Sequence, residues 1–281
     1  MLKNLIKYEF KGTARIFLLT YVVVVVLAGV NAAMLSLKPP SNPSLDLVYN
    51  GASTIMGLLY GIAAFAAFLL TFVIIIVRFY RMLGDEGYLW FTLPVTPAQQ
   101  IFGKLIPAIV WTIVTTIVTL ASVGLVLLGS HWPSQLATTW RGLVAQGYNP
   151  GVWLVCGILF ILISLLVNVM MFYAAMVWGP NLIKNNRLGG SVVAYIIFYI
   201  ALEVVNLVVF LLMLPLLTKA LDGIQTYHGT MPPPPPTGQE IASLNQLGAV
   251  FGGLFGFEYL VLAVVCFIIT RYFLTKKLNL A

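Results

Sequence analysis

Long, uninterrupted runs of apolar residues make up most of the chain, and polar residues gather in the segments between them. Six runs are long enough to cross about 30 Å of hydrocarbon at about 1.5 Å per residue. Continuous runs differ from the strands of a membrane β-barrel, which alternate apolar and polar residues over about 10 positions. The pattern predicts an all-α membrane protein, with one transmembrane domain over residues 1–281. Its six spans cover residues 16–37, 52–77, 105–128, 151–179, 192–218 and 248–270.

Composition agrees with a bilayer environment and charge sets an orientation. The chain has 281 residues, of which 60% are hydrophobic and only 8% are charged, against about a quarter in soluble domains. Lys and Arg flank the apolar runs instead of forming one basic face, so the net charge of +7 does not indicate nucleic-acid binding. Of the 15 Lys and Arg residues, 12 would lie on the side that holds both termini, which predicts cytoplasmic termini. The other 3 are Lys38, Arg141 and Lys219.

Residues 1–15 have the pattern of an amphipathic helix. At 100° per residue, four cationic positions share one arc: Lys3, Lys7, Lys11 and Arg15. The apolar side chains occupy the opposite arc, as in helices that lie in the membrane interface. We therefore predict an interfacial helix, although an ordinary basic flank of the first span would show similar charges. Glu9 falls inside the apolar arc, and this picture does not explain it.

A charged segment, residues 78–104, separates the second and third spans and has the features of a structured loop. Arg78 and Arg81 close the second span, and a turn-rich Gly-Asp-Glu-Gly sequence follows. Thr96 has the position of an N-cap, with proline next and Gln99 at the third helical position, which predicts a capping box. The helix that starts there continues into the third span. A force on the loop would therefore reach that span.

Two interpretations of the loop stay open on physical grounds alone. The aromatic residues between positions 88 and 91 are suited to docking against a cytoplasmic partner. They are equally suited to anchoring the loop in the membrane interface.

Three stretches of the chain resemble permease subunits of the type-2 ABC exporter family, in particular its Firmicutes-type members. They are RFYRMLGDEGYLWFTLPVTP at residues 78–97, LIKYEFKGTARIF at residues 5–17 and RYFLTKKLNL at residues 271–280. With the six-span layout, the resemblance covers nearly the whole chain. It implies an N-terminal elbow helix in the interface and a coupling helix in the first cytoplasmic loop. The long Pro-rich outer loop, residues 219–247, departs from the family pattern, and its role stays open.

The same resemblance implies partners and a location. The coupling helix would seat in a groove of a separate cytoplasmic ABC ATPase, and two permease chains, identical or paralogous, would work with two ATPases in the bacterial plasma membrane. The candidate ATPase contacts are Asp85, Glu86, Tyr88, Phe91 and Leu93.

The chain has no sequence motif for hydrolysing ATP or for other catalysis. A phosphate-binding loop needs G-x-x-x-x-G-K-[ST], whereas Gly103-Lys104 is followed by Leu105. The zinc-protease motif H-E-x-x-H and the serine-hydrolase motif G-x-S-x-G are also missing. We therefore expect a transport subunit without enzymatic activity or cofactor of its own, with ATP and Mg²⁺ bound by the partner ATPase.

Two carboxylates, Glu203 and Glu258, lie inside predicted spans, where charge is costly and usually faces protein or a water-filled cavity. Three interpretations stay open: a substrate path or a site for a cationic group, a proton relay, or a protonated carboxyl hydrogen-bonded between helices. A polar stripe shares the face of Glu203, and a shorter one on the fourth span holds Ser164 and Asn168. The candidate substrate-path residues are Tyr195, Tyr199, Glu203, Asn206 and Glu258.

Two features complete the predictions from sequence. The pairs Gly57/Gly61 and Gly252/Gly256 have the spacing that permits close helix approach. In the outer loops, Trp140 and Tyr148 are residues that favour the membrane interface, and residues 232–236 are consecutive prolines typical of a polyproline II spacer.

Taken together, the sequence favours a permease subunit of an ATP-driven exporter. It would move an amphipathic or hydrophobic substrate, such as a peptide, a lipid or a drug-like molecule, outward by alternating access. Its partners would be the ATPase, a second permease chain and the lipid bilayer, without nucleic acid. The alternative is an intramembrane enzyme or a secondary transporter that uses Glu203 and Glu258.

Overall fold

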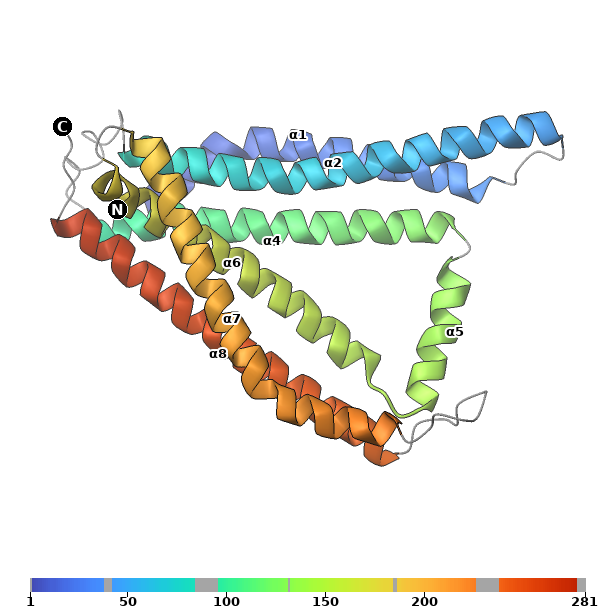
Figure 1. The fold of residues 1–281 in the computed structure, drawn as a ribbon. Helices are drawn as coiled ribbons and strands as arrows, with labels where there is room; N and C mark the ends of the chain where they lie inside the picture. Colours follow the sequence, from blue (N-terminus) through green and yellow to red (C-terminus); the bar gives the residue numbers. More distant parts are fainter. Residues whose placement is uncertain are drawn as a thin grey trace. The chain divides into compact units, whose positions relative to one another are not determined.

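The described part of the chain is an assembly of α-helices without a β-strand (Figure 1). A computed structural model describes residues 2–37, 42–83, 96–130, 132–183, 186–225 and 238–276. Six of its helices are long and apolar enough to cross a membrane, which confirms the predicted all-α membrane fold. The orientation of the termini stays a prediction. The helices are α1 (Leu2–Ser36), α2 (Pro43–Leu83), α4 (Pro97–Gly129), α5 (Trp132–Ala145), α6 (Pro150–Leu182), α7 (Arg187–Gln225) and α8 (Gly238–Lys276).

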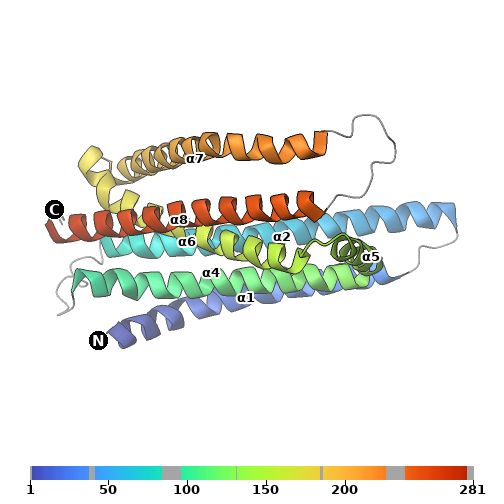
Figure 2. The same cartoon turned by 90° about the horizontal axis from the view of Figure 1, so that it is seen from below.

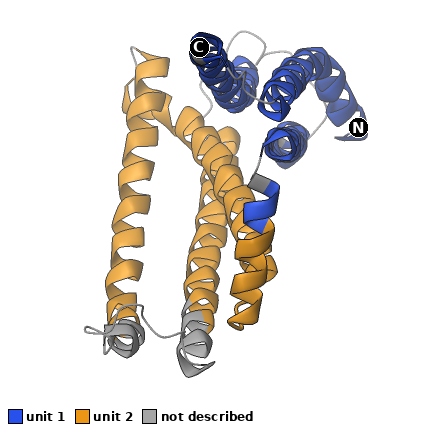
Figure 3. Ribbon diagram, turned by 90° about the vertical axis from the view of Figure 1, so that its right-hand side faces the viewer, with its two compact units in different colours: residues 1–136, 277–281 blue, residues 137–276 orange. Residues whose placement is uncertain are grey.

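The chain divides into two compact units, with the boundary inside α5 between Leu136 and Ala137 (Figure 3). The first unit contains α1, α2 and α4, and the second contains α6, α7 and α8. In each unit, the first long helix packs against both of the others. Whether the two units make one transmembrane domain stays a prediction.

Helix α1 is the central element of the first unit and runs beside α2 and α4 (Figure 2). Its buried positions recur every three or four residues, so they lie along one face of the helix. These positions are Glu9, Thr13, Phe17, Tyr21, Val24, Ala28 and Asn31. The helix is continuous from Leu2, so the amphipathic N-terminal segment and the first span are one element. Its location in the membrane interface stays a prediction.

The predicted start of α4 is confirmed in detail. The hydroxyl of Thr96 accepts a hydrogen bond from the Gln99 backbone N–H at 3.4 Å, and the Gln99 side chain accepts one from the Thr96 N–H at 3.1 Å. Pro97 occupies the first turn, where a missing N–H has no cost. The capping box therefore ends the loop before α4 at a defined residue.

Glycines bring α6 and α7 into direct backbone contact in the second unit. A Cβ atom at Gly190 would overlap the Gly179 carbonyl, and one at Gly179 would overlap the backbone of Ser191. By contrast, Cβ atoms at Gly61 and Gly252 would meet nothing within 4 Å in the described part of the chain. The close approaches of the described helices are therefore at other glycines than the predicted pairs.

Two predicted outer loops contain more helix than expected. Residues 132–145 form α5, and the described flanks of the Pro-rich segment, residues 219–225 and 238–247, belong to α7 and α8. The consecutive prolines at 232–236 lie outside the described residues. The helices extend beyond the apolar runs, because a helix satisfies its own backbone hydrogen bonds in water as well as in lipid.

Candidate functional site

The predicted ATPase-coupling loop is described only through its two flanks. Helix α2 ends at Leu83 and α4 begins at Pro97. The five predicted contact residues lie between them, outside the described residues: Asp85, Glu86, Tyr88, Phe91 and Leu93. What the structure does show is how the chain on either side of the loop is held.

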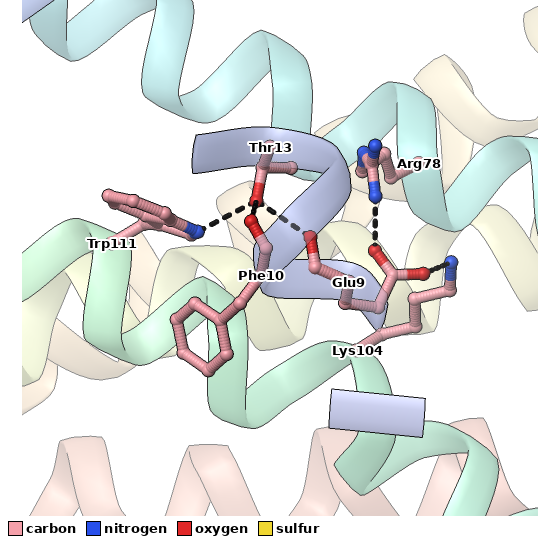
Figure 4. Close-up of polar contacts among 6 residues, drawn as sticks. All are labelled: Glu9, Phe10, Thr13, Arg78, Lys104 and Trp111. Carbon is pink, nitrogen blue, oxygen red and sulfur yellow. Dashed lines mark hydrogen bonds and ion pairs between the residues drawn. The ribbon is translucent and has the colours of Figure 1, made fainter. Parts of the chain in front are cut away.

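A single carboxylate of α1 binds a cation on each side of the loop (Figure 4). Glu9 Oε2 accepts a hydrogen bond from Arg78 Nη1 at 2.6 Å, and Arg78 lies near the end of α2. Glu9 Oε1 forms an ion pair with Lys104 Nζ, near the start of α4. We call Glu9, Arg78 and Lys104 the Glu9 clamp, because it ties both flanks of the loop to α1.

The Glu9 clamp is largely withdrawn from solvent. The exposed fraction of the side chain is 9% for Glu9, 6% for Lys104 and 32% for Arg78. Buried charges are tolerated only when they are paired, so Lys104 in particular depends on the Glu9 carboxylate. Gly12, one turn after Glu9, makes room for the guanidinium, since a Cβ there would lie 2.6 Å from Arg78 Nη2.

Aromatic residues of α1 and α4 pack together next to the Glu9 clamp, and Figure 4 shows two of them, Phe10 and Trp111. The indole N–H of Trp111 donates to the Thr13 hydroxyl at 2.9 Å, and that hydroxyl donates to the Glu9 carbonyl at 2.8 Å. The rings of Phe10 and Phe17 lie 5.8 and 4.4 Å from that of Trp111. The indole therefore links α4 to α1 beside the Glu9 clamp. The apolar rings around it strengthen the charge interactions within the clamp.

Further into the first unit, hydroxyl groups from its three long helices meet. The Tyr21 and Thr115 hydroxyls are 2.7 Å apart, and those of Thr71 and Thr115 are 3.0 Å apart. A second contact, between Tyr60 and Ser122 at 2.9 Å, joins α2 to α4. Polar contacts at several levels thus connect α1, α2 and α4.

The second unit brings the two predicted polar stripes together. The Tyr195 hydroxyl on α7 donates to Asn168 Oδ1 on α6 at 3.2 Å, and Asn168 Nδ2 donates to the Ser164 carbonyl at 2.9 Å. The ring of Phe172 stacks on Tyr195 with centroids 4.2 Å apart. The α7 stripe is therefore fixed to α6 at one end.

The rest of the α7 stripe extends toward α8. Tyr199 stacks on Tyr195 with ring centroids 6.4 Å apart, and Glu203 lies one helical turn further along the same face of α7. Asn206 lies close to Tyr259 of α8, a residue that sequence analysis missed. A signal was available, because Tyr259 is adjacent to the intramembrane Glu258. The structure thus brings together four predicted path residues, Tyr195, Tyr199, Glu203 and Asn206, and adds Tyr259.

Glu258 is the exception among the predicted path residues. Both of its carboxyl oxygens are enclosed, and neither has a hydrogen-bond partner in the described part of the chain. Its carboxyl and that of Glu203 both lie near Tyr259, so the two acids are in one region of the second unit. Such an arrangement can receive a polar or cationic group. Among the described residues, no cluster of three or more His, Cys, Asp or Glu is placed to hold a metal ion.

The Glu9 clamp is the main feature that sequence analysis did not foresee. Its signal was present as the one acid in the apolar arc of residues 1–15. Nothing in the linear pattern connected Glu9 to cations 69 and 95 residues away.

Comparison with known proteins identifies no relative. No protein-family model, curated protein or solved structure matches this chain.

Proposed function

We propose that the chain is the transmembrane permease subunit of a type-2 ABC exporter in a bacterial plasma membrane, with cytoplasmic termini. It works with separate ATPase subunits, which bind ATP and Mg²⁺, and with a second permease chain that is identical or paralogous. It moves an amphipathic or hydrophobic substrate outward by alternating access. The resemblance of residues 78–97 supports this function, as do the six membrane-length apolar helices.

The observation that carries the proposal is the Glu9 clamp. A coupling loop must pass a push from the ATPase to the membrane helices, so its ends need stiff attachments. Here one carboxylate binds Arg78, near the end of the helix before the loop, and Lys104, near the start of the helix after it. The hydroxyl contacts of Tyr21, Thr71 and Thr115 extend this attachment deeper into the first unit. A loop that only anchored the chain in lipid would need no such connection.

The substrate path is assigned to the polar face of the second unit. Tyr199 remains 47% exposed, and the carboxylate beside it, Glu203, is exposed as well. Aromatic rings and hydrogen-bonding groups on an otherwise apolar helix suit an amphipathic molecule. The polar part of such a molecule would exchange one hydrogen-bonding partner for the next as it crosses the membrane. The enclosed carboxyl of Glu258 is available for a polar or cationic part of such a molecule.

Copurification tests the proposal through Phe91. A tagged chain, expressed in its native membrane and extracted in mild detergent, should bring down a nucleotide-binding protein. Truncating an aromatic anchor typically costs about 2 kcal/mol or more of association energy, which is upward of about 25-fold in affinity. Phe91→Ala should therefore release the ATPase while membrane insertion is unchanged.

Phe65→Ala is the matched control, since Phe65 is a 65% exposed aromatic residue of α2 away from the loop, and its loss should leave binding unchanged. Asp85→Ala should weaken binding less than Phe91→Ala, with an effect that shrinks at high salt. If Phe91→Ala retains the ATPase as well as Phe65→Ala does, the loop is an interfacial anchor and the proposed coupling is wrong.

A second candidate function is a secondary transporter, and the enclosed carboxyl of Glu258 favours it. In that case the chain would move its substrate in liposomes under an ion gradient, without an ATPase. Glu258→Gln would abolish this gradient-driven transport. ATP-dependent transport without any response to the gradient would exclude the candidate.

A further inference from the structure

Helix α5, which follows the third membrane-length helix, is strongly amphipathic. At 100° per residue, its apolar side chains Leu136, Trp140, Leu143 and Val144 fall within one arc of about 100°. The polar side chains of the described helix occupy the rest of the circumference: Ser134, Gln135, Thr138, Thr139 and Arg141. The helix therefore has one apolar face and one polar face along its whole length.

The apolar face of α5 is left largely uncovered. The exposed fraction is 46% for Leu136, 43% for Trp140 and 52% for Val144. With 14 residues, α5 is about 21 Å long, too short to cross the hydrocarbon core, and it is not among the six membrane-length helices. An exposed apolar face of this kind marks a surface that contacts lipid or another protein.

The two neighbouring helices place both ends of α5 at the membrane surface. The apolar sequence of α4 continues to Leu128, and α5 begins only three residues after Gly129. Three residues reach at most about 11 Å. On the other side, α6 begins at Pro150 and is apolar from Val152 onward. Neither end of α5 can therefore move far from the hydrocarbon boundary.

Specific backbone and capping hydrogen bonds hold the corner between α5 and α6, and they fix the direction of α5 relative to α6. Gly147 ends α5 with a φ of 91°, in the left-handed region that favours glycine. The N–H groups of Gly147 and Tyr148 donate to the carbonyls of Val144 and Leu143, each at 3.0 Å, which is a Schellman motif. Asn149 then caps α6 through the N–H of Val152 at 3.5 Å. As a result α5 leaves the direction of α6 at a steep angle (Figures 1 and 2).

We propose that α5 lies flat in the membrane interface on the side opposite both termini, with its apolar arc inserted into the lipid. A helix that turns steeply away from a membrane-crossing helix runs along the membrane surface, and an exposed apolar arc on such a helix meets acyl chains. Trp140 is placed at this level by the start of α6, since a Cβ at Gly151 would lie 3.8 Å from its ring. Arg141 is the only charged residue of α5, so binding depends on apolar contact and little on anionic lipid.

Spin labels on the two faces of α5 test the proposal in the full chain. Cys156 and Cys266 are first replaced by alanine, and the protein is reconstituted in phosphatidylcholine nanodiscs. Nitroxides at Leu136→Cys, Trp140→Cys and Val144→Cys are compared with matched labels on the polar face at Ser134→Cys, Thr138→Cys and Arg141→Cys. Relaxation by oxygen, which concentrates in lipid, should dominate on the apolar face. Relaxation by the water-soluble nickel complex NiEDDA should dominate on the polar face, with a period of about 3.6 residues.

Each other outcome contradicts the proposal. Equal NiEDDA access on both faces would place α5 in water. Exclusion of both reagents from the apolar face would mean that protein, such as a second copy of this chain, covers it. Oxygen-dominated relaxation that requires phosphatidylglycerol would show electrostatic rather than apolar binding. If the label at position 140 prevents folding, positions 136 and 144 carry the same comparison.

Discussion

Glu9→Gln is the substitution that bears most directly on how the loop is attached. The amide keeps the shape of the side chain but removes the charge that Arg78 and Lys104 share. A neutral amide oxygen can still accept one hydrogen bond, but it cannot compensate a buried ammonium group. We therefore expect the first unit to lose stability, with Lys104 as the main cause.

The burial of each cation sets the size of this effect. Removing one partner of a buried ion pair typically costs about 3–5 kcal/mol, because an uncompensated charge stays behind. Lys104, with 6% of its side chain exposed, belongs to that class. Arg78 has 32% of its side chain exposed, so its pair with Glu9 is screened by solvent and contributes about 1 kcal/mol or less. At about 2–4 °C per kcal/mol for a chain of this size, Glu9→Gln should lower the unfolding midpoint by roughly 6–20 °C.

Heating followed by fluorescence-detected size-exclusion chromatography in detergent measures these midpoints. Arg78→Gln serves as the matched control and should lower the midpoint by only a few degrees. The double variant Glu9→Leu/Lys104→Met should recover most of the stability lost in Glu9→Gln, because apolar replacement of a whole buried pair is often neutral. A wild-type midpoint for Glu9→Gln, or a larger loss for Arg78→Gln, would refute this account of the clamp.

Three further predictions follow from other contacts. Gly190→Ala should lower the free energy of unfolding by about 1–3 kcal/mol, because the new methyl group would overlap the Gly179 carbonyl. Gly253→Ala, which has open space around it, should cost nothing, so equal unfolding midpoints for the two variants would contradict the α6–α7 backbone contact. Tyr195→Phe should cost about 1 kcal/mol, measured the same way, because it removes only the O–H that binds Asn168; no loss would show that this bond is not formed. Glu258→Met should raise the midpoint while lowering transport, because the enclosed carboxyl has no hydrogen-bond partner in the described chain; a lower midpoint would mean that it is paired.

Sequence reasoning succeeded where the physical cause is local. Long apolar runs predicted the six membrane-length helices, because backbone polar groups in hydrocarbon must bond within their own segment. Thr96 and Gln99 predicted the start of α4, since a capping box involves residues only three apart. The sequence predicts a loop where α5 forms, because the apolar residues there do not make a continuous run, although their spacing has helical periodicity.

It failed where the cause is an approach between distant segments. The two flanks of the loop could be recognised, but the partner of Arg78 and Lys104 is a residue of α1, and only the packed first unit shows it. The same holds for the glycines, because Gly179 and Gly190 touch without the four-residue spacing that marks a helix contact in sequence. The polar stripe of α7 follows from periodicity, whereas its hydrogen bond to Asn168 and its closeness to Tyr259 depend on how α6 and α8 pack against it.

Photo-cross-linking from the loop tests the central claim most directly. A benzophenone amino acid is placed at position 91 of the full chain in its native membrane, with the same group at position 136 on α5 as the control. We predict that irradiation joins position 91, and not position 136, to a cytoplasmic nucleotide-binding protein. The Glu9 clamp variants should still form this cross-link, but the ATP turnover of the nucleotide-binding protein should be less tightly coupled to transport. Cross-links from position 91 to lipid alone would contradict the claim that this loop couples the chain to an ATPase.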